Sequence, residues 1–407
     1  MSTLRRRRTG ARIDPTCTFS QFFELPAGSP ITAAAKRGPA LTFTRDSGDA
    51  TYFDKNALLI KAAVDVPRFD HDPATGASLG LLIEVARTNL LLRSEEFDNA
   101  YWSKNGTSVT ANQAVAPDGT TTADLFTADD GVNDSAFRVV AGVDADSDYT
   151  LSVWIALAPG SDTPAADGNV NLVLFGDLVA TVSNNIGSDV TSLFQRFSVT
   201  GTTNGAPTNF TAQVGLIQSG DSGVKLLVWG AQVEKGSFPT SYISTTSSTV
   251  TRSADVCSTT DLSWFNADGP GTFYVQASQP GVAPNAFLLA ISDGTSNNRI
   301  VMLQNGVNKT QFFMADGGDT QVGLNDLVDW AADTEKKAAF AFATNDAASY
   351  TDGTQTGTDS SVTLPSGLDV FYAGAGETGA AQWNGHIAQI RYWDVRKSNA
   401  FLQSITA

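Results

Sequence analysis

The chain offers few side chains of the kinds that catalyse reactions or bind metal ions. It contains only two histidines, His71 and His386. His71 lies in an Asp-His-Asp-Pro stretch, where a turn hydrogen bond is expected, and His386 precedes an apolar strand, where a structural role is expected. Neither histidine has the partners at the spacing that a zinc site requires. A serine hydrolase triad is not expected either.

Glycoside cleavage is the enzymatic chemistry that the carboxylates leave open. Most glycosidases place two carboxyl groups on opposite sides of the sugar. The last third of the chain has only two glutamates, Glu335 and Glu377, and neither begins a paired motif such as E-x-D-x-E. We therefore expect that the protein is not an enzyme, and a site made of aspartates alone is the alternative that remains open.

Several loops are rich in aspartate, whose oxygens are the ligands that calcium prefers. These loops contain Asp129-Asp130, Asp144-Asp146-Asp148 and Asp316-Asp319. Solvated turns explain the same residues equally well. The sequence requires no cofactor and leaves a structural calcium ion open.

Aromatic residues in loops are the candidates for sugar binding, because the C–H faces of pyranose rings stack on flat aromatic surfaces. Four of them are predicted in or beside loops: Trp102, Trp330, Tyr350 and Trp383. Three other tryptophans, Trp154, Trp229 and Trp393, lie within predicted strands, where packing is expected. For each loop aromatic, a structural role is the competing interpretation.

Positive charge is concentrated at the start of the chain. Residues 1–12 contain no acidic residue and five arginines, Arg5, Arg6, Arg7, Arg8 and Arg12. The other 21 of the 26 basic residues share the rest of the chain with 42 acidic ones. A protein with such an excess of acidic residues is not expected to bind nucleic acid. No apolar run reaches the ~20 residues of a membrane span. We expect the arginines to dock on acidic surfaces of partner proteins, and an irregular N-terminal extension is the alternative.

The composition predicts strands and loops. Charged residues make up 17% of the chain, below the ~25% of an average globular protein. Only seven of the 42 acidic residues are glutamate, and aspartate favours turns whereas glutamate favours helices. The two cysteines, Cys17 and Cys257, do not form a disulfide framework and are expected to stay reduced.

Three segments follow one another. Residues 1–88 contain the basic tail and short strands at 41–44, 50–54 and 57–64, which are too small to fold alone. Residues 89–250 contain closely spaced strands, and in YTLSVWIALA (149–158) the apolar residues alternate with a second, partly apolar face. Residues 251–407 contain hairpin turns at Asp293-Gly294, Asn305-Gly306 and Asp316-Gly317-Gly318, and a short helix after Ser398. The predicted fold class is all-β, with an N-terminal anchoring segment followed by two antiparallel β-sandwich (jelly-roll) domains.

Two long strings carry a resemblance to a known group of proteins. PRFDHDPATGASLGLLIE (67–84) and RTNLLLRSEEFDNAYW (87–102) resemble a segment of bacteriophage head-fibre, tail-fibre and spike proteins that leads into a jelly roll similar to carbohydrate-binding modules. LLVWGAQVEKGSFPTSYI (226–243) is similar to the end of the same jelly roll. This likeness covers roughly residues 41–252. The last third resembles the concanavalin-like (laminin-G-like) fold.

The resemblance implies a structural fibre, spike or decoration protein of a tailed phage virion that contributes to attachment to host surface glycans. Its partners would be other phage capsid or tail proteins, and it would be made in the host bacterial cytoplasm without membrane insertion. A homo-oligomer is expected, with the trimer favoured. The short strands between Leu41 and Leu82 would pack on a neighbouring subunit or on their own chain, the neighbour being slightly favoured. A virion-bound polysaccharide depolymerase is the alternative function.

Overall fold

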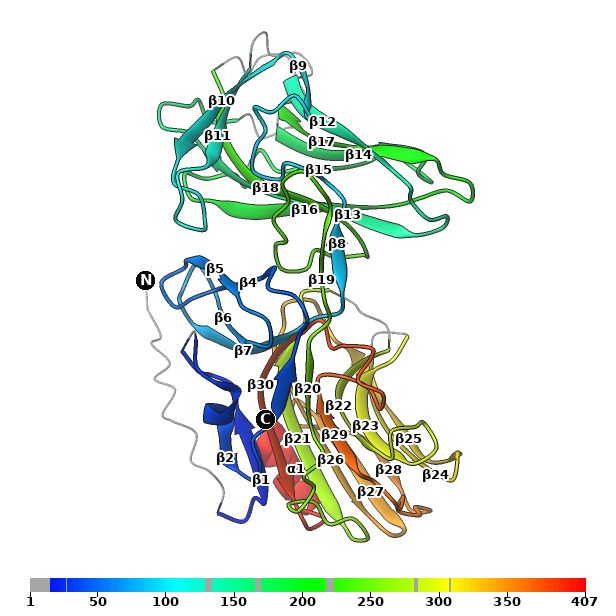
Figure 1. The fold of residues 1–407 in the computed structure, drawn as a ribbon. Helices are drawn as coiled ribbons and strands as arrows, with labels where there is room; N and C mark the ends of the chain where they lie inside the picture. Colours follow the sequence, from blue (N-terminus) through cyan, green and yellow to red (C-terminus); the bar gives the residue numbers. More distant parts are fainter. Residues whose placement is uncertain are drawn as a thin grey trace.

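The computed structural model describes residues 15–26, 28–128, 134–164, 170–216, 223–281, 285–306 and 309–407. Within these ranges nearly all regular structure is antiparallel strand, which confirms the all-β prediction. The α-helix there is α1 (Asn399–Thr406), and the Ser398 side chain caps it by accepting a hydrogen bond from the Phe401 N–H. Figure 1 shows two sandwiches joined by a narrow ribbon. None of the described helices is long and apolar enough to cross a membrane.

The larger sandwich, lower in Figure 1, is made of two sheets. The main path of the nine-stranded sheet follows the order β2 (Ala35–Arg37), β1 (Phe19–Phe22), β30 (Gly385–Trp393), β21 (Gly271–Ser278), β26 (Lys336–Ala343), β27 (Asp346–Thr351) and β28 (Thr354–Asp359). Its two further strands are β7 (Ser78–Ile83), which pairs with β30, and β6 (Arg68–His71), which pairs with β7.

The opposing sheet has seven strands, in the order β25 (Asp319–Asp329), β24 (Lys309–Asp316), β23 (Arg299–Gln304), β22 (Ala286–Ser292), β29 (Val370–Ala373), β20 (Val256–Thr259) and β3 (Thr42–Thr44). The core lies between the two sheets and contains Phe273 and Phe340 from one and Leu289 and Phe312 from the other, all fully buried. The meander from β22 to β25 turns at the predicted sites, Asp293-Gly294, Asn305-Gly306 and Asp316-Gly317-Gly318. The β27–β28 hairpin turns at Asp352 and Gly353, both with positive φ (46° and 77°), as a two-residue turn of this type requires.

The smaller sandwich, at the top of Figure 1, has two five-stranded sheets. The first is β10 (Thr107–Ala114), β11 (Ala123–Ala128), β18 (Lys225–Lys235), β13 (Asp148–Leu157) and β16 (Gln195–Thr202). The second is β15 (Val182–Asn185), β14 (Val170–Gly176), β17 (Asn209–Leu216), β12 (Asp134–Ala141) and β9 (Ser103–Asn105). Along β13, Leu151, Val153 and Ile155 point into the core between these sheets.

Most strands of the first 88 residues belong to the sheets of the larger sandwich, namely β1, β2, β3, β6 and β7. β1 pairs with β30, β3 pairs with β20, and a 3-10 turn, η1 (Ile31–Ala34), precedes β2. Of the strands between Leu41 and Leu82, which were expected on a neighbouring subunit or on their own chain, β3, β6 and β7 find their backbone partners in their own chain. β4 (Ala50–Phe53) and β5 (Leu59–Ala62) form a separate hairpin that lies between the sandwiches.

A two-stranded ribbon connects the sandwiches. It consists of β8 (Arg87–Asn89) and β19 (Val250–Arg252). The predicted boundaries at residues 88 and 250 both fall in this ribbon, since Asn89 lies opposite Val250. Two antiparallel passes of the chain thus run between the sandwiches at one place, and the β4–β5 hairpin lies beside them (Figure 1).

Candidate functional site

The four loop aromatics predicted to contact glycans are buried. The exposed fraction is 2% for Trp102, 2% for Trp330, 6% for Tyr350 and 0% for Trp383. The three indole N–H groups donate to backbone carbonyls of Arg93, Thr334 and Ser278, respectively. Because their faces and donors are already occupied, these rings offer no platform for a sugar from solution. They are structural: Trp330 and Trp383 lie in loops that fold back on the core, whereas Tyr350 lies within strand β27 and not in a loop.

Among the described residues, the other predicted ligand positions form no metal site. Arg5, Arg6, Arg7, Arg8 and Arg12 lie outside the described residues, as do Asp129 and Asp130. In the described ranges no three His, Cys, Asp or Glu side chains form a group that could hold a metal ion. Cys17 and Cys257 are buried as free thiols. The calcium question therefore receives no support from side-chain geometry in this part of the chain.

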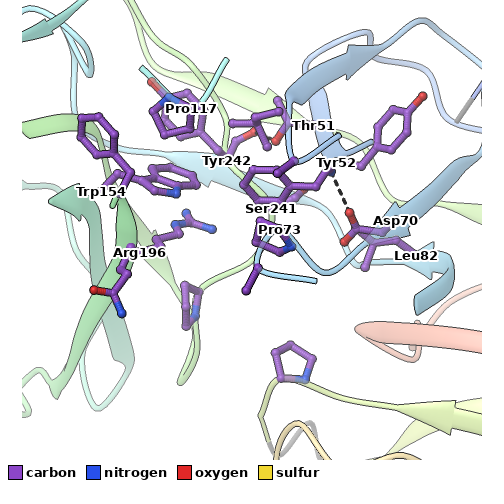
Figure 2. Close-up of a pocket in the computed structure, with 18 of the residues that line it drawn as sticks. Thr51, Tyr52, Asp70, Pro73, Leu82, Pro117, Trp154, Arg196, Ser241 and Tyr242 are labelled. Carbon is purple, nitrogen blue, oxygen red and sulfur yellow. Dashed lines mark hydrogen bonds between the residues drawn. The ribbon is translucent and has the colours of Figure 1, made fainter. Parts of the chain in front are cut away.

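A cleft of about 670 Å³ opens between the two sandwiches, beside the β4–β5 hairpin (Figure 2). Its walls come from every part of the molecule: Tyr52 and Phe53 from β4, Trp154 and Arg196 from the smaller sandwich, and His386 from the larger one. The volume is within the ~300–1,000 Å³ of small-molecule sites. Most of the lining is apolar, with a few polar groups that converge on it.

An aromatic cluster forms the back of this cleft. Trp154 and Trp229 project from the outer face of the β13–β18 pair, and their ring centroids are 5.3 Å apart. Tyr242 packs edge-on against Trp154 at 5.2 Å, and Leu59 of β5 covers the group. The partly apolar second face of YTLSVWIALA was the sequence signal for this contact, although it did not say which segment would cover it.

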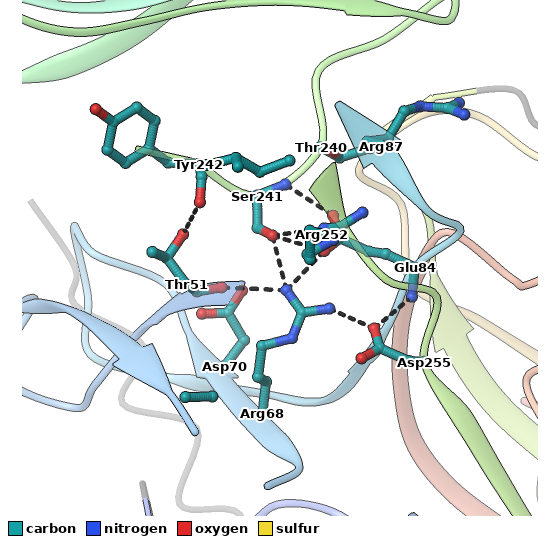
Figure 3. Close-up of polar contacts among 12 residues, drawn as sticks. Thr51, Arg68, Asp70, Glu84, Arg87, Thr240, Ser241, Tyr242, Arg252 and Asp255 are labelled. Carbon is teal, nitrogen blue, oxygen red and sulfur yellow. Dashed lines mark hydrogen bonds and ion pairs between the residues drawn. The ribbon is translucent and has the colours of Figure 1, made fainter. Parts of the chain in front are cut away.

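Beside the cleft lies a buried network of charges, which we call the joint: Arg45, Arg68, Glu84, Arg252 and Asp255. Figure 3 shows the last four of these residues. Arg68 pairs with both Glu84 and Asp255, Arg252 pairs with Glu84, and Arg45 Nη1 is 3.2 Å from Asp255. All five side chains are at most 5% exposed. The network connects β6, the end of β7 and the two passes of the interdomain ribbon.

The joint holds its acids in the ionised form. Burial alone would raise the pKa of Glu84, but the guanidinium groups of Arg252 and Arg68 and the hydrogen bonds from Ser241 outweigh burial and place that pKa below its usual range. Burial likewise opposes the charge of Arg68, yet the carboxylates of Asp255 and Glu84 raise its pKa. Glu84 is therefore a carboxylate at any ordinary pH and is a poor general acid.

The two histidines stabilise the same region. His386 of β30 lies 2.8 Å from Asp70 of β6, measured from Nε2 to Oδ2. Asp70 also accepts the N–H of Phe53, at 2.7 Å. His71 Nδ1 lies 3.2 Å from the Phe53 carbonyl oxygen. His386 thus has the structural role that the sequence predicts, whereas His71 ends strand β6 and contacts β4 instead of making the predicted turn hydrogen bond.

One stretch has the letters of a serine nucleophile elbow, Gly76-Ala77-Ser78-Leu79-Gly80. An elbow requires a strand, a sharp turn and a helix in that order. Here a turn leads into strand β7, and Ser78 lies opposite His71 in the ladder. The Ser78 hydroxyl makes no hydrogen bond to the described residues. The stretch is the turn before strand β7 and the start of that strand, and it is not a nucleophile elbow.

Comparison with known proteins does not assign a family. No protein-family model and no curated protein matches the chain. Among solved structures, the CBM40 domain of the Ruminococcus gnavus IT-sialidase, bound to α2,3-sialyllactose, has a TM-score of 0.32 and 13% identity, over 35% of this chain and 84% of that domain. Domain 4 of AbnA, a GH43 extracellular arabinanase of Geobacillus stearothermophilus, in complex with arabinotriose, has a TM-score of 0.33 and 9% identity, over 42% of this chain and 82% of that domain.

The NanB sialidase of Streptococcus pneumoniae also matches, with a TM-score of 0.31 and 14% identity, over 35% of this chain and 25% of the enzyme. The structural neighbours thus include carbohydrate-binding modules. The similarity reaches little more than a third of the chain at these scores and does not transfer a ligand or an activity.

Proposed function

We propose that the protein is a structural component of a tailed phage virion, a head or tail fibre, spike or decoration protein, that contributes to attachment to host surface glycans. One observation carries the proposal. The segment that resembles phage appendage proteins, residues 67–102, supplies Arg68 and Glu84 of the joint and strand β8 of the ribbon between the sandwiches.

Individual residues of that segment make buried contacts that connect the two sandwiches. Arg68 and Glu84 supply the central ion pair. Asn89 is fully buried, and its side-chain amide donates to the carbonyls of Ala231 and Ile243, which fastens the ribbon to the smaller sandwich. These polar groups have their partners inside the protein, so changing one would leave the others unsatisfied. A segment with such constraints suits a protein whose two sandwiches must keep a set spacing.

A fixed spacing is useful in an appendage that transmits contact from a cell surface to the particle. The first segment would dock to other capsid or tail proteins through Arg5, Arg6, Arg7, Arg8 and Arg12, by charge-assisted hydrogen bonds to carboxylates. The assembly would be a homo-oligomer, with a trimer favoured. The protein would be made in the host cytoplasm and end in the virion.

Deleting residues 2–12 tests the docking role. The sandwiches should remain folded, because none of these residues belongs to a described strand. Incorporation into purified particles should fall, and electron micrographs with the chain labelled should show its place on the virion. Normal incorporation of the shortened chain would make the arginines a passive tail, and absence of the full-length chain from particles would end the virion proposal.

Binding to intact host cells tests the attachment role. Fluorescently labelled protein should bind host cells and lose this binding after the cell-surface glycans are oxidised with periodate. Binding that survives oxidation would point to a protein receptor instead.

We further propose that the protein does not hydrolyse the glycans that it meets. The depolymerase alternative needs a carboxyl group that can donate a proton. Of the two acids that line the cleft, Glu84 is kept ionised by arginines, and the Asp70 carboxylate is already hydrogen-bonded to the Phe53 N–H and to His386. Incubation with host capsular polysaccharide or lipopolysaccharide should release no new reducing ends. Release would revive the depolymerase, and single replacements of Asp and Glu would then locate its carboxylates.

A further inference from the structure

We propose that the cleft between the sandwiches binds a short oligosaccharide that carries a carboxylate, and that Arg196 binds this carboxylate. The inference rests on the proposed attachment to glycans and adds the place of binding and the class of sugar. It depends on the charges, the geometry and the apolar lining of the cleft.

The charges that line the cleft are unequally compensated. Glu84 is paired with Arg68 and Arg252, and Asp70 is hydrogen-bonded to His386 and to the Phe53 N–H. Arg196 is the other charged residue of the lining, and it forms no ion pair with the residues that the structure describes. A cation that is left without a counter-ion in a cleft is a candidate site for an anion.

The Arg196 guanidinium is held in one orientation by neutral groups. Nη1 donates to the Thr240 carbonyl oxygen at 2.6 Å, and Nη2 donates to the Ser152 hydroxyl at 2.9 Å. The guanidinium carbon lies 4.5 Å from the ring centroid of Trp154 (Figure 2). Because none of these partners is a carboxylate, the positive charge is positioned without being neutralised.

Arg196 keeps its charge at the pH of a cell surface. Burial in the cleft lowers its pKa to about 10, and the nearby carboxylate of Glu234 opposes that decrease. Glu234 itself lies 3.6 Å from Arg87 and accepts hydrogen bonds from Thr240, so it is already occupied. The guanidinium is thus a cation with lowered hydration, a condition that strengthens its hydrogen bonds to an anion.

The remainder of the lining suits the apolar faces of sugar rings. Phe53 and Phe194 are half-buried at the cleft, and Pro73 is exposed at its mouth. Gln195 is exposed beside them; its Oε1 accepts a hydrogen bond from Thr191, and its amide NH2 group can donate to sugar hydroxyl groups. Apolar walls with a few polar groups at set places are typical of small-ligand sites. The volume limits the ligand to a short oligosaccharide.

Titration calorimetry with two probes tests the proposal: trigalacturonic acid and the neutral trisaccharide galactotriose. Wild-type protein should bind the acid more tightly than the neutral sugar. The Arg196→Gln variant should bind the acid at least about tenfold more weakly, because a charge-assisted pair is lost. Its affinity for the neutral sugar should change little.

A matched control is Arg138→Gln. Arg138 also lies over an aromatic ring, 4.2 Å from the centroid of Tyr101, and also donates to a backbone carbonyl, that of Tyr101 at 3.0 Å. It lies on β12, in the other sheet of the same sandwich, and does not line the cleft. Its replacement should leave the affinity for both probes unchanged.

A second variant keeps the test valid if Arg196→Gln does not fold. Ala74 lines the cleft and is exposed, so Ala74→Trp should fold and fill the mouth of the cleft. It should abolish binding of the acidic probe. Unchanged binding in this variant would move the site elsewhere and overturn the proposal.

The outcomes separate this inference from the function on which it rests. Equal affinity for the two probes, or an Arg196→Gln variant with wild-type affinity, would overturn the acidic-sugar site and leave attachment to glycans intact. Failure of wild-type protein to bind either probe would also overturn the cleft site. Attachment itself would be in error only if the same protein also failed to bind intact host cells.

Discussion

Arg68 and Asp255 are 187 residues apart in the chain, yet they form an ion pair in which neither side chain is exposed (Figure 3). Arg68 leaves from β6, which extends the nine-stranded sheet, and Asp255 lies between the ribbon strand β19 and β20 of the opposing sheet. The Asp255 carboxylate also accepts the backbone N–H of Glu84, at 2.9 Å. One carboxylate thus connects both passes of the ribbon to the larger sandwich.

Replacing Asp255 by Asn should destabilise the protein by about 3–5 kcal/mol, because Arg68 and Arg45 would lose a buried counter-ion. Chemical denaturation, followed by tryptophan fluorescence, measures this difference. The control is Asp144→Asn. Asp144 pairs with Lys235 at 2.9 Å, but both side chains are more than half exposed, so the free energy of unfolding should hardly change. Equal effects of the two replacements would contradict a central role for the joint.

The contribution of Glu84 should depend on pH in a defined direction. Its pKa in the folded protein is below its usual value, and its unfolded pKa is about 4.3. The unfolded chain therefore takes up the proton first, so the stabilisation is complete above about pH 4.3 and is lost as the pH falls toward the folded pKa. The difference in unfolding free energy between wild type and Glu84→Gln should be largest near pH 7 and should shrink toward pH 3. A difference that grows toward pH 3 would contradict the assignment.

Local patterns of the sequence were sufficient for the strands, the hairpins and the terminal helix. Asp352-Gly353 turns where two positive φ angles are needed, and Ser398 begins α1 by capping it. Trp154, Trp229 and Trp393 are buried, as their positions within strands predict. These features depend on neighbours a few residues away in the sequence. The spacing of apolar residues and the residue types at turns are therefore enough to predict them.

The cleft and the joint could not be predicted in this way, because both depend on residues that are distant in sequence. Trp330 and Trp383 lie in loops, as expected, but their rings are not open to a glycan. They pack against each other with centroids 4.9 Å apart, and each shields the other from solvent. The period of two in β13 indicated a second apolar face, but only the folded chain shows that Leu59 covers it. Arg196 carried no local signal that it would face a cleft.

Neighbouring leucines test the packing of the β4–β5 hairpin on the smaller sandwich. Leu59 is 6% exposed and contacts the Trp154, Trp229 and Tyr242 cluster, whereas Leu58 is 37% exposed. Leu59→Ala should cost about 2–5 kcal/mol of unfolding free energy through lost contacts and a cavity. Leu58→Ala should cost much less. Similar losses in the two variants, measured by denaturation, would show that the hairpin does not stabilise the contact between the sandwiches.

Gly80 should be the least replaceable glycine of residues 67–102. Its φ is +106°, and a Cβ placed on it would lie 2.3 Å from the Ile387 carbonyl oxygen, where β7 pairs with β30. Because the obstacle is backbone, Gly80→Ala must move one strand away from the other in addition to the strain of a positive φ. The control is Gly294→Ala, whose φ is +80° and whose added Cβ would meet nothing within 4 Å. That variant should lose only about 1–2 kcal/mol. Gly80→Ala should lose clearly more, seen as a lower midpoint of unfolding or as a loss of soluble protein. Equal midpoints would mean that β7 and β30 are not in the close contact on which the joint depends.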